Sequence, residues 1–390
     1  MRNPLSKVIT EIEPSGIRKF FDIVSEMKDA ISLGVGEPDF DTPWHIRDEG
    51  IYSLEKGRTF YTSNAGLKEL KIEISNFLNR KYGLDYDYNH EIMVTVGGSE
   101  AIDIAMRAML DPGDEVLIPQ PSYVSYLPCA RLAGGVPVVI ELKAENQFRL
   151  TRDELEAAIT PKTKILVLPF PNNPTGAVME RSDLEELVDV IVANDLYVIT
   201  DEIYSELTYT EEGHVSIAAM PGMRDRTIYI NGLSKSHAMT GWRIGLIFAP
   251  AVLTAQLIKS HQYLVTAAAT MAQFAAIEAL SAGKDDAQPM KVEYLKRRDY
   301  ILEKMTELGF KIIKPDGAFY IFAKIPEGYT QDSFKFCQDF AREKAIAIIP
   351  GVAFGKYGEG YVRLSYAASM DTIETAMTRL KEFMEEHAEA

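Results

Sequence analysis

The sequence predicts an α/β protein: a large domain built as three layers around a mostly parallel sheet, and a smaller α+β domain after it. Two observations predict this class. Short apolar runs typical of strands alternate with helical patterns through most of the chain, a rhythm that favours parallel strands joined by helices. The remaining residues mix strands and amphipathic helices in another order. The expected division is an N-terminal segment (1–40) that packs with the small domain, a large domain (41–285) and the small domain (286–390).

Length, charge and cysteine content limit the possible functions. The chain has 390 residues, which is too long for one ordinary core. Its 41 Lys and Arg against 57 Asp and Glu give a net charge of −16, which argues against nucleic acid or an anionic membrane as a partner. Cys129 and Cys337 cannot form a disulfide framework and show no metal spacing. Residues 1–16 do not resemble a signal peptide, and no apolar run is long enough to span a membrane, so we expect a cytoplasmic protein.

The N-terminal elements lead to a turn with two glycines. Apolar residues at helical spacing predict a helix over 15–28, and its Arg18 could either contact a distal substrate carboxylate or lie on the surface. A short strand at 31–33 follows. Gly34 and Gly36 then suggest close approach of the backbone to another group, although a plain turn has the same composition.

A strand, a glycine turn and a helix start come next. Residues 91–96 read as a strand, Gly98 and Ser99 follow, and a helix is expected over 101–110. Free N–H groups and the positive end of a helix dipole at such a corner bind anions. Ser99 as an ordinary helix cap would give the same pattern.

Strands and helices then continue to alternate, and polar residues follow three of the strands. Asn173 follows a strand at 164–168, Asp201 follows 196–200 and Lys235 follows 227–231. Ligands in doubly wound sheets bind beyond the carboxyl ends of the strands. Three such coincidences favour one binding site. The other expected elements are strands at 115–118, 136–141 and 244–249, and helices at 67–80, 123–132, 151–159 and 180–194.

Lys235 and Arg243 suggest the chemistry of this site. A lysine amine can bond to an aldehyde, and a guanidinium can bind a phosphate with two N–H groups. Pyridoxal phosphate carries both groups and also needs a partner for its ring nitrogen. Asp201 suits that task, and Asn173 and Tyr204 can reach the ring oxygen. The alternatives are a solvated surface lysine, a turn-forming Asp or Asn, and a packed tyrosine.

The C-terminal part offers one further candidate. Arg363 lies in a predicted strand at 361–366 between apolar neighbours, where an unpaired charge is costly. A substrate carboxylate would satisfy it, and so would an internal pair with Glu359. A long helical region over 253–308, broken near 283–286, is expected to end in a solvated charged helix. Further strands are expected at 310–314 and 318–325, and helices at 333–344 and 370–386.

The segment Ser234-Lys235 followed by Thr240-Gly-Trp-Arg243-Ile-Gly245 closely resembles the cofactor-lysine signature of class I/II aminotransferases, pyridoxal phosphate enzymes of fold type I. The resemblance covers about 15–383, and several segments look particularly like Gram-positive aromatic aminotransferases and aminotransferase A. It implies an amino acid:2-oxo acid aminotransferase, with an aromatic donor and 2-oxoglutarate as acceptor. Aspartate or N-acetyl-LL-diaminopimelate aminotransferases, and a C–S β-lyase on the same scaffold, remain alternatives.

The resemblance also implies roles for individual residues. Gly98, Ser99, Ser234 and Arg243 would bind the phosphate, and Tyr123 would stack on the ring. Gly36, Asn173 and Arg363 would contact the substrate, Asp201 and Tyr204 would bind the ring, and Lys235 would carry a proton as a neutral amine, its pKa lowered by burial and nearby cations. Tyr61 would reach the phosphate of a neighbouring subunit, which implies a homodimer with shared sites. Gly232 departs from relatives that have a phosphate-binding hydroxyl there.

Overall fold

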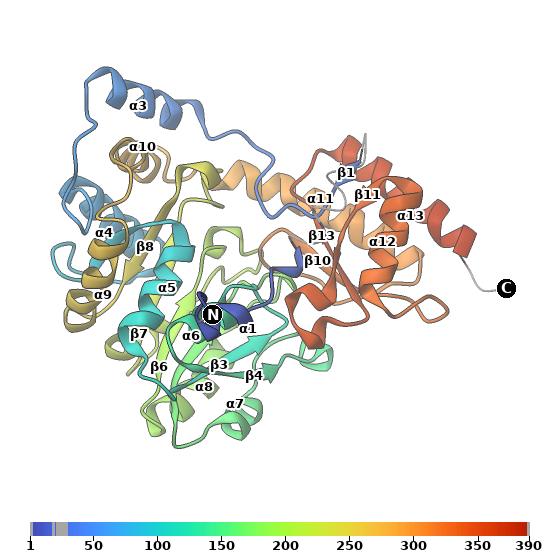
Figure 1. The fold of residues 1–390 in the computed structure, drawn as a ribbon. Coiled ribbons are helices and arrows are strands. Elements are labelled where there is room, and N and C mark those ends of the chain that lie inside the picture. Colours follow the sequence, from blue (N-terminus) through green and yellow to red (C-terminus); the bar gives the residue numbers. More distant parts are fainter. Residues whose placement is uncertain (1–2, 18–19, 21–29, 388–390) are drawn as a thin grey trace.

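The computed structural model describes residues 3–17, 20 and 30–387, and Figure 1 shows their arrangement. The predicted helix at 15–28, with Arg18, lies mostly outside the described residues. The helices of the described part are α1 (Lys7–Glu11), α3 (Trp44–Glu55), α4 (Lys68–Tyr82), α5 (Gly97–Met109), α6 (Tyr126–Leu132), α7 (Arg152–Ala158), α8 (Arg181–Ala193), α9 (Ala251–Leu264), α10 (Thr270–Ser281), α11 (Ala287–Glu307), α12 (Ser333–Lys344) and α13 (Met370–His387).

A seven-stranded sheet forms the centre of the large part of the protein. Its strand order is β2-β8-β7-β6-β5-β3-β4. β8 runs antiparallel to both of its neighbours, whereas the other pairs are parallel, so the predicted mostly parallel sheet is confirmed. The strands are β2 (Ile92–Val96), β3 (Glu115–Gln120), β4 (Val136–Glu141), β5 (Thr163–Leu168), β6 (Tyr197–Asp201), β7 (Thr227–Gly232) and β8 (Ile244–Phe248).

Helices cover both faces of this sheet and make three layers. On one face, α5, α6 and α9 pack on alternate strand residues such as Val116, Ile199 and Ile228. The residues next to these, among them Leu117, Val198 and Tyr229, point to the other face, where α3, α4 and α10 cover one half and α7 and α8 the other. Because both faces are buried, the strands are almost continuously apolar, and each can be recognised in the sequence as a short apolar run.

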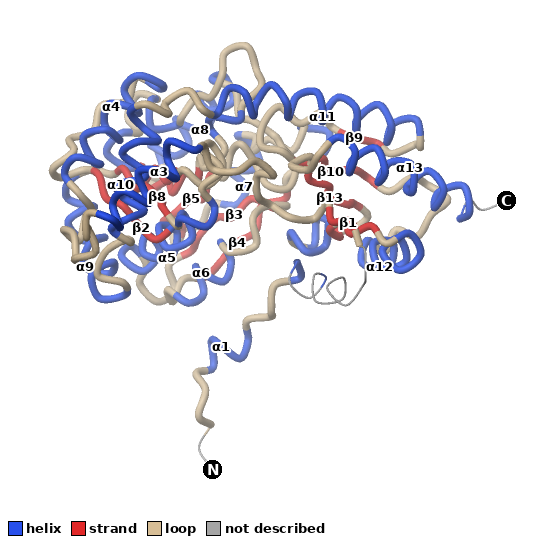
Figure 2. The backbone as a smooth tube through the Cα atoms, turned by 90° about the horizontal axis from the view of Figure 1, so that it is seen from above, coloured by secondary structure: helices blue, strands red, loops and turns tan. Residues whose placement is uncertain are grey.

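A second, four-stranded sheet lies in the C-terminal part. Its order is β12-β13-β10-β9, with antiparallel neighbours. The strands are β9 (Lys311–Ile312), β10 (Tyr320–Lys324), β12 (Ile349–Pro350) and β13 (Tyr361–Ser365). β1 (Ile31–Ser32) pairs in parallel with β11 (Ile346–Ala347), which fixes the residues just before Gly34 to this part. In both views α11 runs from the large part to the C-terminal part, and α1 extends away from the body (Figure 2).

Some expectations about the helices were wrong. The charged face of α11 is not fully solvated, because Arg297 and Arg298 are each only 5% exposed. Arg297 donates to Asp39 Oδ1 over 2.8 Å and Arg298 donates to the Pro315 carbonyl over 3.1 Å. The sequence also gave no sign of α3 or of the break between α9 and α10, and the helix expected from residue 123 begins at Tyr126. Tertiary partners decide these features, and local patterns do not show them.

Candidate active site

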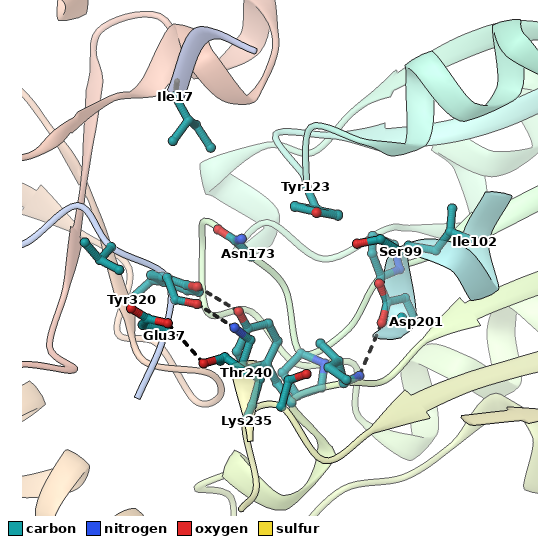
Figure 3. Close-up of a pocket in the computed structure, with 18 of the residues that line it drawn as sticks. Ile17, Glu37, Ser99, Ile102, Tyr123, Asn173, Asp201, Lys235, Thr240 and Tyr320 are labelled. Atoms are coloured by element: carbon teal, nitrogen blue, oxygen red, sulfur yellow. Dashed lines mark hydrogen bonds between the residues drawn. The ribbon is translucent and has the colours of Figure 1, made fainter. Parts of the chain in front are cut away.

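One cavity of about 570 Å³ opens where the strand ends of the large sheet face the C-terminal part. Figure 3 shows Ser99 and Asp201 on one side of this cavity and Glu37 and Tyr320 on the other. Every predicted site residue except Tyr61 lines it. These are Gly36, Gly98, Ser99, Tyr123, Asn173, Asp201, Tyr204, Ser234, Lys235, Arg243 and Arg363.

The parallel sheet explains how distant residues meet. Asp201 is the last residue of β6, and β7 ends at Gly232, shortly before Ser234 and Lys235. Since β6 and β7 are neighbouring parallel strands, their carboxyl ends lie side by side. Asn173 follows β5, the next strand in the sheet. Chain order and the edge of the sheet therefore place these groups around one cavity.

Lys235 lies inside this cavity as a buried amine. Its Nζ donates a hydrogen bond of 2.5 Å to the Gly36 carbonyl. Burial lowers the pKa of Lys235 to about 8; the carboxylate of Glu37 opposes the shift, and the cations Arg243 and Arg363 add to it. The sequence-based prediction that burial and nearby cations lower the pKa of Lys235 agrees with this environment. A lysine of this kind supplies a neutral amine near neutral pH, as a nucleophile or a proton carrier must.

Asp201 is the buried acid of the site. Burial raises its pKa to about 6, while hydrogen bonds from Tyr126 Oη (2.8 Å) and the Ile203 N–H (3.3 Å) oppose the shift. Tyr126 was missed from the sequence. The only available signal was its position three residues after Tyr123, which places both tyrosines on one side of a helical turn. An ionised Asp201 can hold a proton on a ring nitrogen beside it.

The corner between β2 and α5 has no room for a side chain. Gly97 has φ +74°, and a Cβ there would lie 2.2 Å from Arg243 Nη2. Arg243 itself adopts a left-handed backbone conformation with φ 56°, and its Nη1 donates to the Thr240 carbonyl over 2.9 Å. The guanidinium therefore lies against the start of α5, beside Gly98 and Ser99, and a phosphate would meet free N–H groups and a cation together. α5 begins at Gly97, so Ser99 is not its cap.

Gly232 is explained by close packing. A Cβ at this position would lie 2.8 Å from the Ile244 carbonyl oxygen, so a hydroxyl-bearing side chain does not fit without movement. Ser234 lines the cavity two residues later. It is therefore the residue in this segment whose hydroxyl can reach a phosphate.

Arg363 is buried at the other end of the cavity, with 2% exposure. Its Nη1 donates to Asn173 Oδ1 over 2.9 Å, its Nη2 donates to the Gly34 carbonyl, and its Nε has no partner. The alternative pair with Glu359 is wrong, because Glu359 Oε1 accepts from the Ser333 and Gly360 N–H groups. A buried guanidinium that pairs with no carboxylate of the described residues is suited to bind one from a substrate.

Tyr320 is a second residue that sequence reasoning missed. Its hydroxyl pairs with that of Tyr204 over 2.7 Å, and the Arg363 guanidinium lies 4.4 Å from its ring centre. It also lies so close to Gly36 that a Cβ there would be 2.7 Å from the hydroxyl. Tyr320 lies in a segment that resembles the family, but the resemblance gave it no role; β10 brings it into the cavity from the C-terminal sheet.

Two other residues lie outside the cavity. Tyr61 is 90% exposed. His237 faces away from the site, with its ring nitrogens contacting Ser236 Oγ at 2.7 Å and the Gly283 carbonyl at 3.0 Å.

The residues fit pyridoxal phosphate: a glycine corner beside an arginine for the phosphate, a buried acid for the ring nitrogen and a buried amine for the aldehyde. A model of the family described as "Aminotransferase class I and II" matches residues 28–380. The chain therefore belongs to this family and is a pyridoxal phosphate-dependent aminotransferase. When bound, the cofactor accepts the electrons released at the substrate's α carbon.

Relatives with different substrates share this architecture. A Bacillus subtilis (strain 168) protein named as a probable N-acetyl-LL-diaminopimelate aminotransferase is 44% identical over 100% of this chain and 98% of its own. A Pyrococcus abyssi aspartate aminotransferase is 45% identical over 96% and 97%. The structure of an aromatic aminotransferase from Pyrococcus horikoshii OT3 matches with a TM-score of 0.89 and 43% identity, covering 94% and 99%. Within the described residues, no helix is long and apolar enough to cross a membrane.

Proposed function

We propose that this aminotransferase takes aromatic L-amino acids as donors and 2-oxoglutarate as acceptor. The residues that line the cavity support the proposed class of amino acid donor. Ile17, Val35 and Tyr123 provide apolar and aromatic surface. The cations among the described lining residues are Lys235, Arg243 and Arg363, and each has a task in binding cofactor or substrate. The described lining has no further cation for a distal carboxylate, which favours an aromatic donor over aspartate; Arg18, the candidate for such a carboxylate and so for the second carboxylate of 2-oxoglutarate, lies outside the described residues.

The proposed roles follow from position. Gly98, Ser99, Ser234 and Arg243 bind the phosphate, and Asp201 holds the proton on the ring nitrogen. Tyr123 covers the ring, and its side chain projects into the cavity (Figure 3).

Asn173 and Tyr204 contact the ring oxygen. Arg363, with Gly36 beside it, binds the substrate carboxylate. Lys235 would take the proton from the substrate's α carbon, and its lowered pKa supports this task.

A spectroscopic half-reaction screen tests the donor class. We expect tyrosine and phenylalanine to convert the bound cofactor with higher kcat/KM than aspartate, glutamate and an acyl-diaminopimelate. 2-Oxoglutarate should regenerate the starting absorbance of the cofactor as acceptor, with phenylpyruvate run for comparison. Preference for aspartate or the diaminopimelate would overturn the donor proposal. Release of pyruvate and a thiol from cystathionine, without an acceptor, would indicate a β-lyase instead.

The Lys235→Ala variant tests the site itself. Loss of the amine should abolish both turnover and the absorbance band that depends on the covalent bond between Lys235 and the cofactor aldehyde. Lys311, an exposed lysine of β9, gives a matched control, because Lys311→Ala should change neither. Transamination retained by Lys235→Ala would contradict the assignment.

We also propose a homodimer with shared sites, in the cytoplasm. The side chains of Phe60, Tyr61 and Tyr263 are 81%, 90% and 86% exposed. Large exposed aromatic side chains favour a protein–protein interface over a free surface. In a dimer, Tyr61 would reach the phosphate of the other subunit. Sedimentation equilibrium should give a dimer, and Tyr61→Phe should weaken cofactor binding. A monomer with full activity would contradict both statements.

The division into a large domain (41–285), a small domain (286–390) and an N-terminal segment (1–40) is part of the proposal. The parallel pairing of β1 with β11 supports assigning the N-terminal segment to the small domain. Limited proteolysis with cleavage confined near these boundaries would support the division.

A further inference from the structure

A buried carboxylate lies in the first turn of α5, next to the proposed phosphate site. Glu100 follows Ser99 directly, and its side chain is only 10% exposed. Its Oε2 accepts the N–H of Val96, so the side chain turns back over the corner between β2 and α5. This contact holds the corner in place. It also puts a negative charge at the helix end where a phosphate has to bind.

His261 is the partner of this carboxylate. It comes from α9, which packs on the same face of the sheet as α5, and its side chain is fully buried. Its Nδ1 lies 2.7 Å from Glu100 Oε1. Among the described residues, its Nε2 has no hydrogen-bond partner. A buried polar group without a partner lowers the stability of the folded protein. An apolar side chain at position 261 would avoid this loss but could not contact Glu100. The contact with Glu100 is therefore what a histidine provides here.

Charge determines what this contact does for a ligand. A dianionic phosphate at Gly98 and Ser99 is attracted by the N–H groups of α5 and by Arg243, and repelled by the Glu100 carboxylate when that side chain turns toward it. In a dry corner such repulsion is screened much less than at the surface. We propose that His261 is a positioning residue for cofactor binding: its hydrogen bond with Glu100 Oε1 holds that carboxylate turned back onto the Val96 N–H, where it fixes the corner and is kept from the phosphate. This inference depends on the proposed phosphate site.

A comparison of two ligands tests it on the unloaded protein. Pyridoxal phosphate and pyridoxal share the aldehyde and the ring, so they differ only in the phosphate. His261→Leu should weaken the binding of pyridoxal phosphate roughly tenfold, the effect of a modest unscreened charge interaction, and leave that of pyridoxal nearly unchanged. Equilibrium dialysis of both ligands measures this difference directly.

Combined variants identify the cause. Glu100→Gln keeps the shape of the side chain and removes its charge, so the loss caused by His261→Leu should disappear in the Glu100→Gln background. His261→Gln, which keeps a donor, should retain most of the affinity. His90 is exposed and contacts Asp87 far from the site, so His90→Leu should change neither ligand.

The outcomes separate the possible errors. Equal weakening for both ligands by His261→Leu would show a merely structural role and overturn the inference. If His261→Leu does not fold, Glu100→Gln alone decides: unchanged or tighter binding of pyridoxal phosphate supports the inference, and weaker binding overturns it. If the wild-type protein binds both ligands equally, the proposed phosphate site is itself wrong.

Discussion

The Tyr126→Phe substitution isolates one hydrogen bond to the acid of the site. Tyr126 Oη donates to Asp201 Oδ2 over 2.8 Å, and both residues are buried. The ring of Tyr126 packs edge-on against Tyr123, and phenylalanine preserves that contact. Burial raises the pKa of Asp201 to about 6, and the hydrogen bond from Tyr126 opposes this shift. Its removal should therefore raise the pKa further.

The size of the change follows from the type of bond. A hydrogen bond to a charged group contributes about 1.5–3 kcal/mol, or roughly one to two pKa units. The pKa of Asp201 in the variant should then lie at about 7 to 8. Because Asp201 has to be ionised to hold a proton on the ring nitrogen, the acid limb of the pH profile for cofactor binding to the unloaded protein should move upward.

The stability of the unloaded protein gives an independent assay. The folded-state pKa of Asp201 lies above its ordinary value of 3.8, so the folded state binds this proton more tightly than the unfolded state does. The free energy of unfolding therefore falls as the pH rises from 3.8 to about 6, and in Tyr126→Phe the fall should continue to about 7 to 8. Tyr366→Phe is a matched control, since this buried tyrosine donates to the Ala318 carbonyl. An unmoved acid limb in Tyr126→Phe would refute the reasoning.

Three further predictions concern other parts of the structure. Gly97→Ala should weaken cofactor binding by roughly tenfold or more, because its Cβ would displace the Arg243 guanidinium. Gly83→Ala is the control, since Gly83 has a similar positive φ but open space around it. An equal loss of cofactor binding in Gly83→Ala would point to backbone strain as the cause. Arg363→Leu should raise the KM of amino acid substrates roughly a hundredfold with little change in cofactor affinity, and an unchanged KM would exclude Arg363 as the carboxylate site. His45 lies between Glu278 and Asp286. Burial lowers the pKa of His45, but the hydrogen bonds to the two carboxylates outweigh burial and raise this pKa above 6.5. The contribution of His45 to stability is present below pH 6.5 and is lost as the pH rises through its raised pKa. The difference in Tm between wild type and His45→Gln should therefore shrink at alkaline pH. A difference in Tm that does not depend on pH would contradict this prediction.

The sequence predicts the site where local rules apply. Asp201 and Lys235 could be placed together because both follow buried strands, and parallel strands end at one edge of a sheet. Arg363 could be identified because a charge between apolar strand residues needs a partner. Pairings across long sequence separations could not be foreseen. Tyr204 and Tyr320 are 116 residues apart, and Glu100 and His261 are 161 apart. No local pattern marks such contacts.

Burial connects these two kinds of residue. It raises the pKa of Asp201 toward neutrality and lowers that of Lys235 toward it, because a dry site disfavours the charged form of acid and amine alike. Tyr320 and Arg363 of the C-terminal sheet form part of the cavity wall. The residues that follow strands of the large sheet therefore provide the acid and the amine. Residues such as Tyr320, to which no role could be assigned from the sequence, bury these groups and so bring their pKa values near neutrality. An account of this site from its signature sequence alone would name the correct acid and amine and miss the cause of their reactivity.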